Sequence, residues 1–333
     1  MSGSDAGGGD GADRGGDADG DAPVDHEFTV RQARPADVEH VVAFTQDTWG
    51  DRHGDYMPDV FSDWVETDGP RQHTLVVDVD GGDDVAGVLQ CVLLSDTEAW
   101  AQGMRVNPDY RGRNLSPRLS RAALRWARDR GAVVCRNMVF SWNMAGLGQS
   151  RAVGFGPCTE FRWLQPAPDP DASPDLDVVA DPDAAWAYWS RSDAREHLRG
   201  LAMDSGESWA CSELTRGDLR DAVDRDGLFA VVDGGTRAMS ALAYTYDRES
   251  DDGDDSEEET WGVYHAAAWD DTDALEALAD AVARDAAERG IDNTRILIPE
   301  GVRWVSDAAA TRTPVSDEPD FVTAADLTDE SIY

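Results

Sequence analysis

The chain has 333 residues, 41% of them hydrophobic, and its 67 acidic and 29 basic residues give a formal net charge of −38. This length and apolar content predict a protein of two domains with a sizeable core. We expect no association with a membrane, because no stretch of the sequence approaches the roughly 18 apolar residues that a membrane span requires.

The excess of acidic residues predicts a protein adapted to multimolar salt, as in an extreme halophile. At about 1 M salt the Debye length is only about 3 Å, so self-repulsion is screened there, whereas in dilute buffer it should destabilise the fold. The cysteines lack CxxC spacing, which favours buried thiols in a reducing cytoplasm over disulfides or a metal site. The four cysteines are Cys91, Cys135, Cys158 and Cys211.

The elements of the first half follow one another closely. Residues 1–25 consist mainly of Gly, Asp and Ala without an apolar segment, which predicts a disordered acidic tail. A catalytic domain is expected over 26–165. In chain order the hydrophobic patterns predict a strand at 28–31, helices at 35–45 and 58–65, a hairpin of 74–79 with 85–94, a strand at 100–106, a helix at 117–130, a strand at 132–140, a helix at 144–152 and a strand at 159–164.

A polar, proline-rich linker over 166–175 separates this domain from a second one at 176–333. The second half repeats part of the first, and an acidic run at 253–259 is expected to form an exposed loop. The fold class predicted is α/β, a mixed twisted sheet flanked by helices followed by a second, degenerate lobe of the same kind. The repeated elements are strands at 228–233, 238–246 and 261–268, a helix at 274–289 and a strand at 295–298.

One window reverses the sign of the charge. Residues 110–159 contain nine arginines and a single acid, Asp129, so the window carries +8 while the rest of the chain carries −46. Such a reversal indicates an anionic partner. The window opens with Tyr110-Arg111-Gly112-Arg113-Asn114-Leu115-Ser116-Pro117, which is typical of a phosphate-binding turn before a helix.

The residue types in this turn suit that role. Gly112 allows close approach of a ligand to the backbone, and Asn114 is the non-glycine residue best able to adopt a positive φ. Ser116 can cap a helix, and Pro117 suits the first helical position, so we expect the helix to begin at Pro117. In the second half the corresponding residues 270–273 are Asp-Asp-Thr-Asp, which would repel a phosphate.

At this turn the chain resembles the GNAT superfamily of N-acetyltransferases, whose signature Arg/Gln-x-x-Gly-x-Gly/Ala follows a strand and precedes a helix. Asn114 and Ser116 stand where that family has Gly and Gly or Ala. The resemblance covers roughly 27–165 and implies acetyl-CoA as the acyl donor. The residues implied to bind the coenzyme are Met104, Arg105 and Val106 on a splayed strand, Arg111, Gly112, Arg113, Asn114, Leu115 and Ser116 in the turn, and Asn143.

A looser similarity points toward members that resemble histidine N-acetyltransferase and modify free amino acids. It lies in Asp55-Tyr56-Met57-Pro58 with Trp64-Val65, followed by Gly103 to Val106. The resemblance implies that Trp49, Asp55 and Tyr56 border the acceptor site, where acids would attract an ammonium group. The expected partner is therefore a small amine or amino acid. Whether the chain also forms a homodimer is left open.

Acetyl transfer requires a base, donors for the carbonyl oxygen and an acid for the leaving thiolate. Strand alternation places Glu98 on one face with Gln102, so Glu98 is a candidate general base, with an ordinary exposed acid as the alternative. Ser150 stands where many GNAT members have the tyrosine that acts as the acid. Either Ser150 relays a proton, or Tyr110 serves, or the thiolate leaves without help.

Arg111, Arg113 and Arg118 lie nearest the turn and are candidates to pair with coenzyme phosphates. The other arginines of the helix are expected on a solvated face. Two other functions remain open: a GNAT-shaped pseudoenzyme that binds CoA without turnover, and a nucleic-acid-binding module that uses the arginine stripe. The charge of −46 outside the window argues against nucleic acid.

Overall fold

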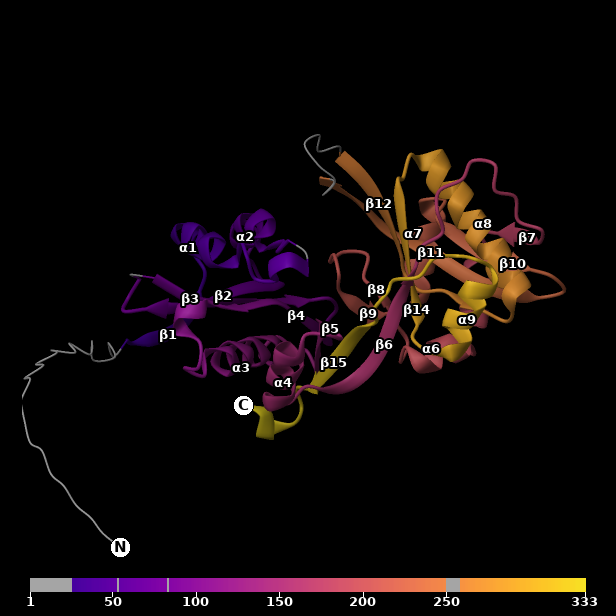
Figure 1. Cartoon of the computed structure of the whole chain (residues 1–333). Helices are drawn as coiled ribbons and strands as arrows, with labels where there is room; N and C mark the ends of the chain where they lie inside the picture. The colour runs from indigo at the N-terminus through magenta and orange to yellow at the C-terminus, as the bar shows by residue number, and fades with distance from the viewer. Residues whose placement is uncertain (1–25, 53, 83, 250–257) are drawn as a thin grey trace, which may run out of the picture.

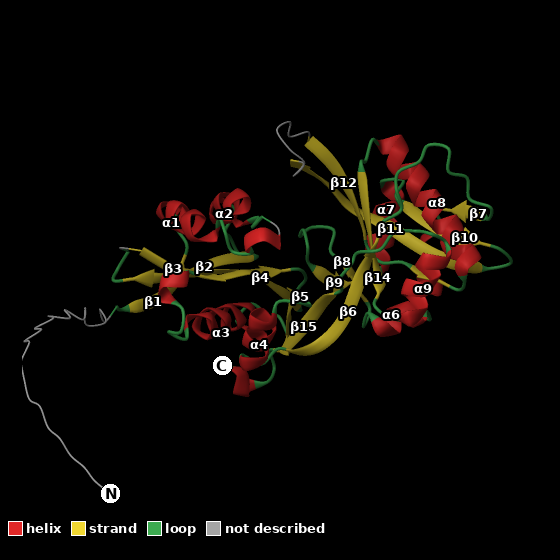
Figure 2. Cartoon of the chain, viewed as in Figure 1, coloured by secondary structure: helices red, strands yellow, loops and turns green. Residues whose placement is uncertain are grey.

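The computed structural model describes residues 26–52, 54–82, 84–249 and 258–333. The expected acidic tail at 1–25 and most of the expected loop at 253–259 lie outside the described residues. Among the residues described, no helix is long and apolar enough to cross a membrane. The predicted mixed α/β fold is confirmed, with one large sheet running through both halves of the chain (Figure 1, Figure 2).

The first half contains the predicted elements in the predicted order, with short 3-10 turns added. Helices α1 and α2 cover one face of the sheet, while α3 and α4 cover the other (Figure 1). The elements are β1 (Phe28–Gln32), η1 (Pro35–Asp37), α1 (Val38–Thr45), η2 (Gly50–Arg52), α2 (Met57–Glu66), β2 (Gln72–Val79), β3 (Asp84–Leu93), β4 (Glu98–Val106), η3 (Pro108–Tyr110), α3 (Leu115–Arg128), β5 (Val134–Phe140), α4 (Met144–Ala152) and β6 (Gly156–Leu164).

The second half contains the repeated elements together with several that the sequence patterns did not predict. The repeated ones are β10 (Leu228–Val232), β11 (Thr236–Glu249), β12 (Glu258–Tyr264), α8 (Thr272–Arg289) and β14 (Asn293–Pro299). The additional ones are β7 (Asp177–Val179), α5 (Pro182–Trp189), α6 (Asp193–His197), β8 (Leu201–Met203), β9 (Cys211–Glu213), α7 (Arg216–Asp224), β13 (Ala268–Trp269), α9 (Val302–Ala310), β15 (Asp320–Asp326) and η4 (Glu330–Ile332).

The order of strands shows that the two halves share their central strands. The main path runs β1-β2-β3-β4-β5-β15-β6-β14-β12-β11-β10-β7. Strand β15, which comes from the second half, lies antiparallel between β5 and β6 of the first. Strand β6 in turn pairs with β14 of the second half. Strand β15 of the second half therefore lies within the sheet of the first half, and β6 of the first half joins the edge of the second-half strands at β14.

Each half of the chain has its own apolar core, and one core also takes in residues from the other half where the two meet. Helix α3 packs its apolar side, including Leu119, Ala123 and Leu124, on β2, β3 and β4. The largest core of the second half lies under α5, α6 and α7 and also takes in Trp100 of β4 and Phe161 of β6. Burial of these large side chains across the junction contributes to holding the two halves together.

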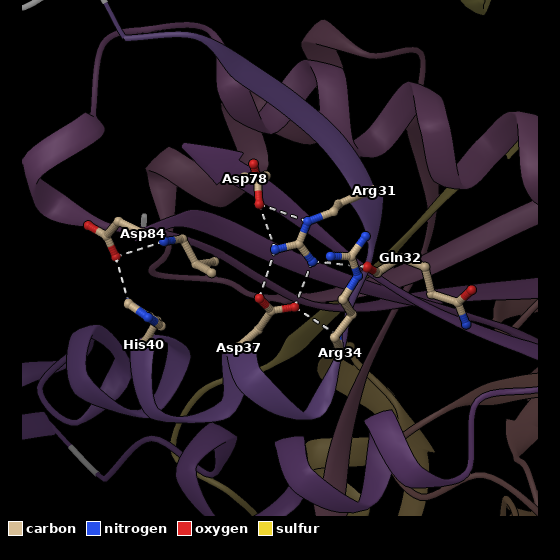
Figure 3. Close-up of polar contacts among 8 residues, drawn as sticks. Arg31, Gln32, Arg34, Asp37, His40, Asp78 and Asp84 are labelled. Carbon is tan, nitrogen blue, oxygen red and sulfur yellow. Dashed lines mark hydrogen bonds and ion pairs between the residues drawn. The ribbon is translucent and has the colours of Figure 1, made fainter. Parts of the chain in front are cut away.

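An arginine clasp fixes the start of the first half. The guanidinium of Arg31 donates to both carboxylate oxygens of Asp37, at 2.7 and 2.8 Å, and its Nε donates to Asp78 at 2.8 Å (Figure 3). Asp37 also accepts from the backbone amide of Arg34 at 2.7 Å. These contacts connect β1, β2 and the turn that opens α1, so the Pro35-Ala36-Asp37 segment is held against the sheet.

Candidate active site

Strands β4 and β5 form the predicted splay. They pair in parallel only from Glu98 to Trp100, and beyond Trp100 strand β4 pairs with β3 alone among the described strands. The register of β3 and β4 shifts next to Gly103, whose φ is +68°. A Cβ at this position would lie 2.6 Å from the Trp64 ring, so only glycine fits. The edge of β4 that faces β5 is thus left unpaired from Ala101 onward.

The predicted turn lies directly after this strand. Gly112 has φ +78°, and Asn114 adopts the left-handed conformation with φ 59° and ψ 35°, as its residue type predicts. Helix α3 begins at Leu115, so the expected start at Pro117 is wrong. Ser116 is the second helical residue rather than the cap, and Pro117 is the third. The left-handed turn at Asn114 redirects the chain into the helix two residues earlier than the proline signal indicates.

A cavity of about 410 Å³ opens at the N-terminus of α3. Because the first amides of a helix lack intrahelical partners, backbone N–H groups are available here for an anion. Gln149 of α4, which the sequence did not single out, also lines the cavity and donates to Ser120 at 2.8 Å. The lining residues are Val106, Tyr110, Arg111, Gly112, Arg113, Asn114, Leu115, Ser116, Pro117 and Gln149.

The arginines near the turn differ in their surroundings. Arg111 and Arg113 are exposed and line the cavity, and the Arg113 guanidinium lies 5.4 Å from the centre of the Phe28 ring. Arg118 donates to the carbonyl of Phe28 at 2.5 Å and is therefore directed at β1. Farther along the helix, Arg128 lies over the Tyr333 ring. Two of the three arginines proposed for the phosphates thus face the cavity.

The strand and the predicted acceptor loop meet in a buried ion pair. Arg105 of β4 donates to both carboxylate oxygens of Asp55, at 2.7 and 2.9 Å, and the side chains are only 9% and 0% exposed. The same guanidinium lies over Trp49 at 4.7 Å and over Tyr56 at 5.4 Å. The sequence placed these residues in two separate sets, and the structure brings them together beside α2.

Two other predicted coenzyme residues, Met104 and Asn143, are not among those that line the cavity. Met104 packs its side chain on the core beneath α3, so only its backbone faces the unpaired edge of β4. Asn143 caps α4 by accepting from the amide of Gly146 at 2.9 Å. Contact of Asn143 with the coenzyme therefore remains an expectation from the sequence.

The candidate catalytic residues are already engaged with protein groups. Glu98 lies at the closed end of the splay, where it accepts from Arg136 at 2.5 Å and from the amide of Glu213 at 3.2 Å. Ser150 is buried and accepts from Asn137 at 3.0 Å. Their roles as base and acid stay predictions.

The alternative acid, Tyr110, donates to Asp84 at 2.8 Å. Burial and this hydrogen bond raise the pKa of Tyr110 to about 12. A raised pKa makes Tyr110 a weaker acid near neutral pH, and its role as the acid stays a prediction.

The part of the chain that contains the turn is similar to a known protein family. Residues 38–148 match the model of the acetyltransferase (GNAT) family. This region is therefore similar to the GNAT family over about a third of the chain. The match includes all of β4, the turn and α3, and therefore every residue that lines the cavity except Gln149. No curated protein matches the chain significantly.

Solved structures extend the fold likeness beyond this domain. A GCN5-related N-acetyltransferase from Sphaerobacter thermophilus is 14% identical with a TM-score of 0.57, covering 90% of this chain and 96% of its own. A candidate acetyltransferase from Thermoplasma acidophilum is 17% identical with a TM-score of 0.52, covering 90% and 99%. Both alignments span the two halves, so the fold of the whole chain recurs in them.

Proposed function

We propose that this GNAT protein transfers an acetyl group from acetyl-CoA to the amine of a small molecule or amino acid, in a cytoplasm of high salt. The observation that carries the proposal is the cavity at the mouth of α3, beside the unpaired edge of β4. Helix amides and two exposed arginines favour a diphosphate there, and an unpaired strand edge offers hydrogen bonds to an extended chain of amide groups.

The residues of the turn fit such a donor. Gly112 and Asn114 both hold positive φ, and a Cβ added at Gly112 would meet no other atom within 4 Å, so the space above the glycine is open. Arg111 and Arg113 would pair with phosphate oxygens, and the backbone of Met104 to Val106 would bind the pantetheine arm. Bound acetyl-CoA would supply the thioester carbonyl that the amine attacks.

The proposed acceptor site lies beside Arg105 and Asp55. The Trp49 and Tyr56 rings lie there against the Arg105 guanidinium, and Tyr56 is 45% exposed. Because Arg105 already neutralises Asp55, the ion pair shapes the site and adds no free charge to it. Aromatic side chains at the site favour a flat acceptor, and among free amino acids histidine is the first to test.

A CoA-binding pseudoenzyme is the rival, and one observation favours it. Ser150 accepts a hydrogen bond from Asn137 within the protein and is buried, so it has little access to a leaving thiolate. General acid assistance is worth roughly 10² to 10⁴ in rate, so its loss slows an enzyme without abolishing turnover. The rivals therefore differ in turnover and not in binding.

Thermal melting in molar KCl with acetyl-CoA, followed by thiol release on a panel of amines, tests the proposal. Coenzyme at 100 Kd should stabilise the protein by about 2.7 kcal/mol. Turnover together with stabilisation supports the enzyme, and stabilisation alone supports the pseudoenzyme. Stabilisation by DNA without any effect of the coenzyme would refute both.

The chain offers a matched pair of variants. Gly112 and Gly234 have φ of +78° and +65°, and a Cβ on either meets no other atom within 4 Å. Gly112→Ala and Gly234→Ala should therefore cost a similar backbone strain of roughly 1–2 kcal/mol. Only Gly112→Ala places a methyl group in the proposed phosphate site, so only it should weaken coenzyme binding.

A further inference from the structure

A short loop of the second half reaches the splayed strand of the first. Residues 204–210 connect β8 and β9, and Glu207 in this loop accepts from the Gln102 side chain of β4 at 2.7 Å. Gln102 is the residue before Gly103, where β4 has already separated from β5. The loop therefore places a carboxylate near the closed end of the splay, where the unpaired edge of β4 begins.

The hydrogen bonds around Gln102 fix its orientation. Its Nε2 also donates to Oε1 of Gln90 at 2.8 Å, and Nε2 of Gln90 donates to Thr74 at 3.1 Å. Thr74 donates in turn to Asp68 at 2.9 Å. Each donor in this chain points toward Asp68, so the second N–H of Gln102 Nε2 remains for Glu207.

The loop itself is held firmly. Oδ1 of Asp204 accepts from the amides of Gly206 and Glu207, both at 2.9 Å, and the amide of Asp204 donates to Ala210. The amide of Trp209 donates to the Tyr244 hydroxyl at 3.1 Å. The position of Glu207 is thus set by the fold of the second half and does not depend on its own side-chain contact.

Glu207 differs from Glu98 in its charge environment. Among the described residues no ion pair involves Glu207, whereas Glu98 is paired with Arg136. Burial and the neighbouring Asp204 raise the pKa of Glu207, and the donation from Gln102 offsets part of this effect. A half-buried carboxylate without a cation is a better proton acceptor than one paired with arginine.

We propose that Glu207 of the second half is the general base for acetyl transfer in the GNAT domain of the first. The proposal rests on the acetyltransferase function proposed above. The amine nitrogen forms a bond to the thioester carbon, its proton passes to a carboxylate oxygen of Glu207, and the carbon–sulfur bond breaks to release the CoA thiolate. The second half then contributes a catalytic residue to the site.

The groups that face Glu207 define the expected pH dependence. They are Gln102 from β4, Asp204 from its own loop, and Tyr56 from the start of α2. None of the three is a cation, so protonation of Glu207 should control the acidic limb of the kcat/KM profile. That limb should lie above the ordinary glutamate range because the pKa of Glu207 is raised.

The test compares Glu207→Gln with Glu98→Gln in the full chain in molar KCl. Glutamine at 207 still offers an oxygen to Gln102, so the contact between the halves persists while proton acceptance is lost. We expect kcat to fall by about 10² or more, the acidic limb to disappear, and the melting shift with CoA to stay unchanged. Glu213→Gln, on the exposed carboxylate of the adjacent strand β9, serves as the control and should keep wild-type kcat.

The outcomes separate this inference from the proposed function. If the wild type turns over and Glu207→Gln keeps both its kcat and its acidic limb, the role of Glu207 is refuted. Loss of the limb in Glu98→Gln alone would assign the base to Glu98 instead. If wild-type protein binds CoA and releases no thiol with any amine, the proposed function itself fails, irrespective of Glu207.

Discussion

Removal of the Asp55 carboxylate is expected to destabilise the protein more than loss of most single ion pairs would. The carboxylate is fully buried, and Arg105 is 9% exposed, so Asp55→Asn leaves a guanidinium with little access to water. Breaking a buried pair in this way typically costs about 3–5 kcal/mol. Trp49 and Tyr56 still face the cation and should retain about 0.5–1 kcal/mol each. We therefore expect a loss of about 3 kcal/mol.

The assay is urea unfolding in molar KCl, with Glu330→Gln as the control. Glu330 pairs with Arg128 at 3.5 Å but is 86% exposed, so its loss should cost less than about 1 kcal/mol. A cycle of Asp55→Ala, Arg105→Met and the double variant should give a coupling energy of about 2 kcal/mol or more. A cost below about 1 kcal/mol for Asp55→Asn, or a coupling near zero, would show that the pair is not desolvated as described.

Three further predictions follow from charge and packing. The melting temperature should rise steeply from dilute to molar KCl because the net charge is −38, and a flat response would refute the halophilic interpretation. Burial raises the pKa of Asp37, but the Arg31 and Arg34 donors outweigh it and lower the pKa overall. The contacts of Asp37 should therefore stabilise the fold at a pH above the pKa of Asp37 in the unfolded chain, and this stabilisation should be lost as the pH falls through the lower pKa of the folded state. Asp37→Asn should flatten this acid dependence of the urea midpoint. An unchanged dependence would contradict the prediction. Gly103→Ala should cost at least about 2 kcal/mol in urea unfolding, since its Cβ would meet Trp64, whereas Gly50→Ala carries only the strain of a positive φ; equal losses would refute the clash.

The local part of the site could be predicted from sequence. A turn that needs small residues and a positive φ leaves a pattern in adjacent positions, and Gly112 and Asn114 adopt the backbone expected of them. The order of the first-half elements was predicted for the same reason, because periodicity over a single element is a local signal. The helix start was misplaced by two residues, since Pro117 is tolerated anywhere in the first turn of a helix.

The long-range part could not be predicted. Strand β15 pairs with β5 through residues 320–326 and 134–140, and nothing in either pattern names the other. The same holds for Glu207 and Gln102, which are 105 positions apart. The position of such an inserted strand depends on which edges of the neighbouring strands the rest of the sheet leaves unpaired. This is a property of the whole sheet and is absent from any window of sequence.

The two halves share one sheet but differ at the N-termini of helices α3 and α8. In α8 the cap is Asp271, which accepts from Ala274 and pairs with Arg237, while Asp270 accepts from the Tyr188 hydroxyl at 2.7 Å. Side chains of the second half therefore occupy the position that an anion would need, whereas a cavity opens at the mouth of α3. What the second half supplies instead is β15, which fills the gap between β5 and β6, and the loop that carries Glu207. The sheet of the first half is thus completed by a strand of the second, so the two halves form one structural unit.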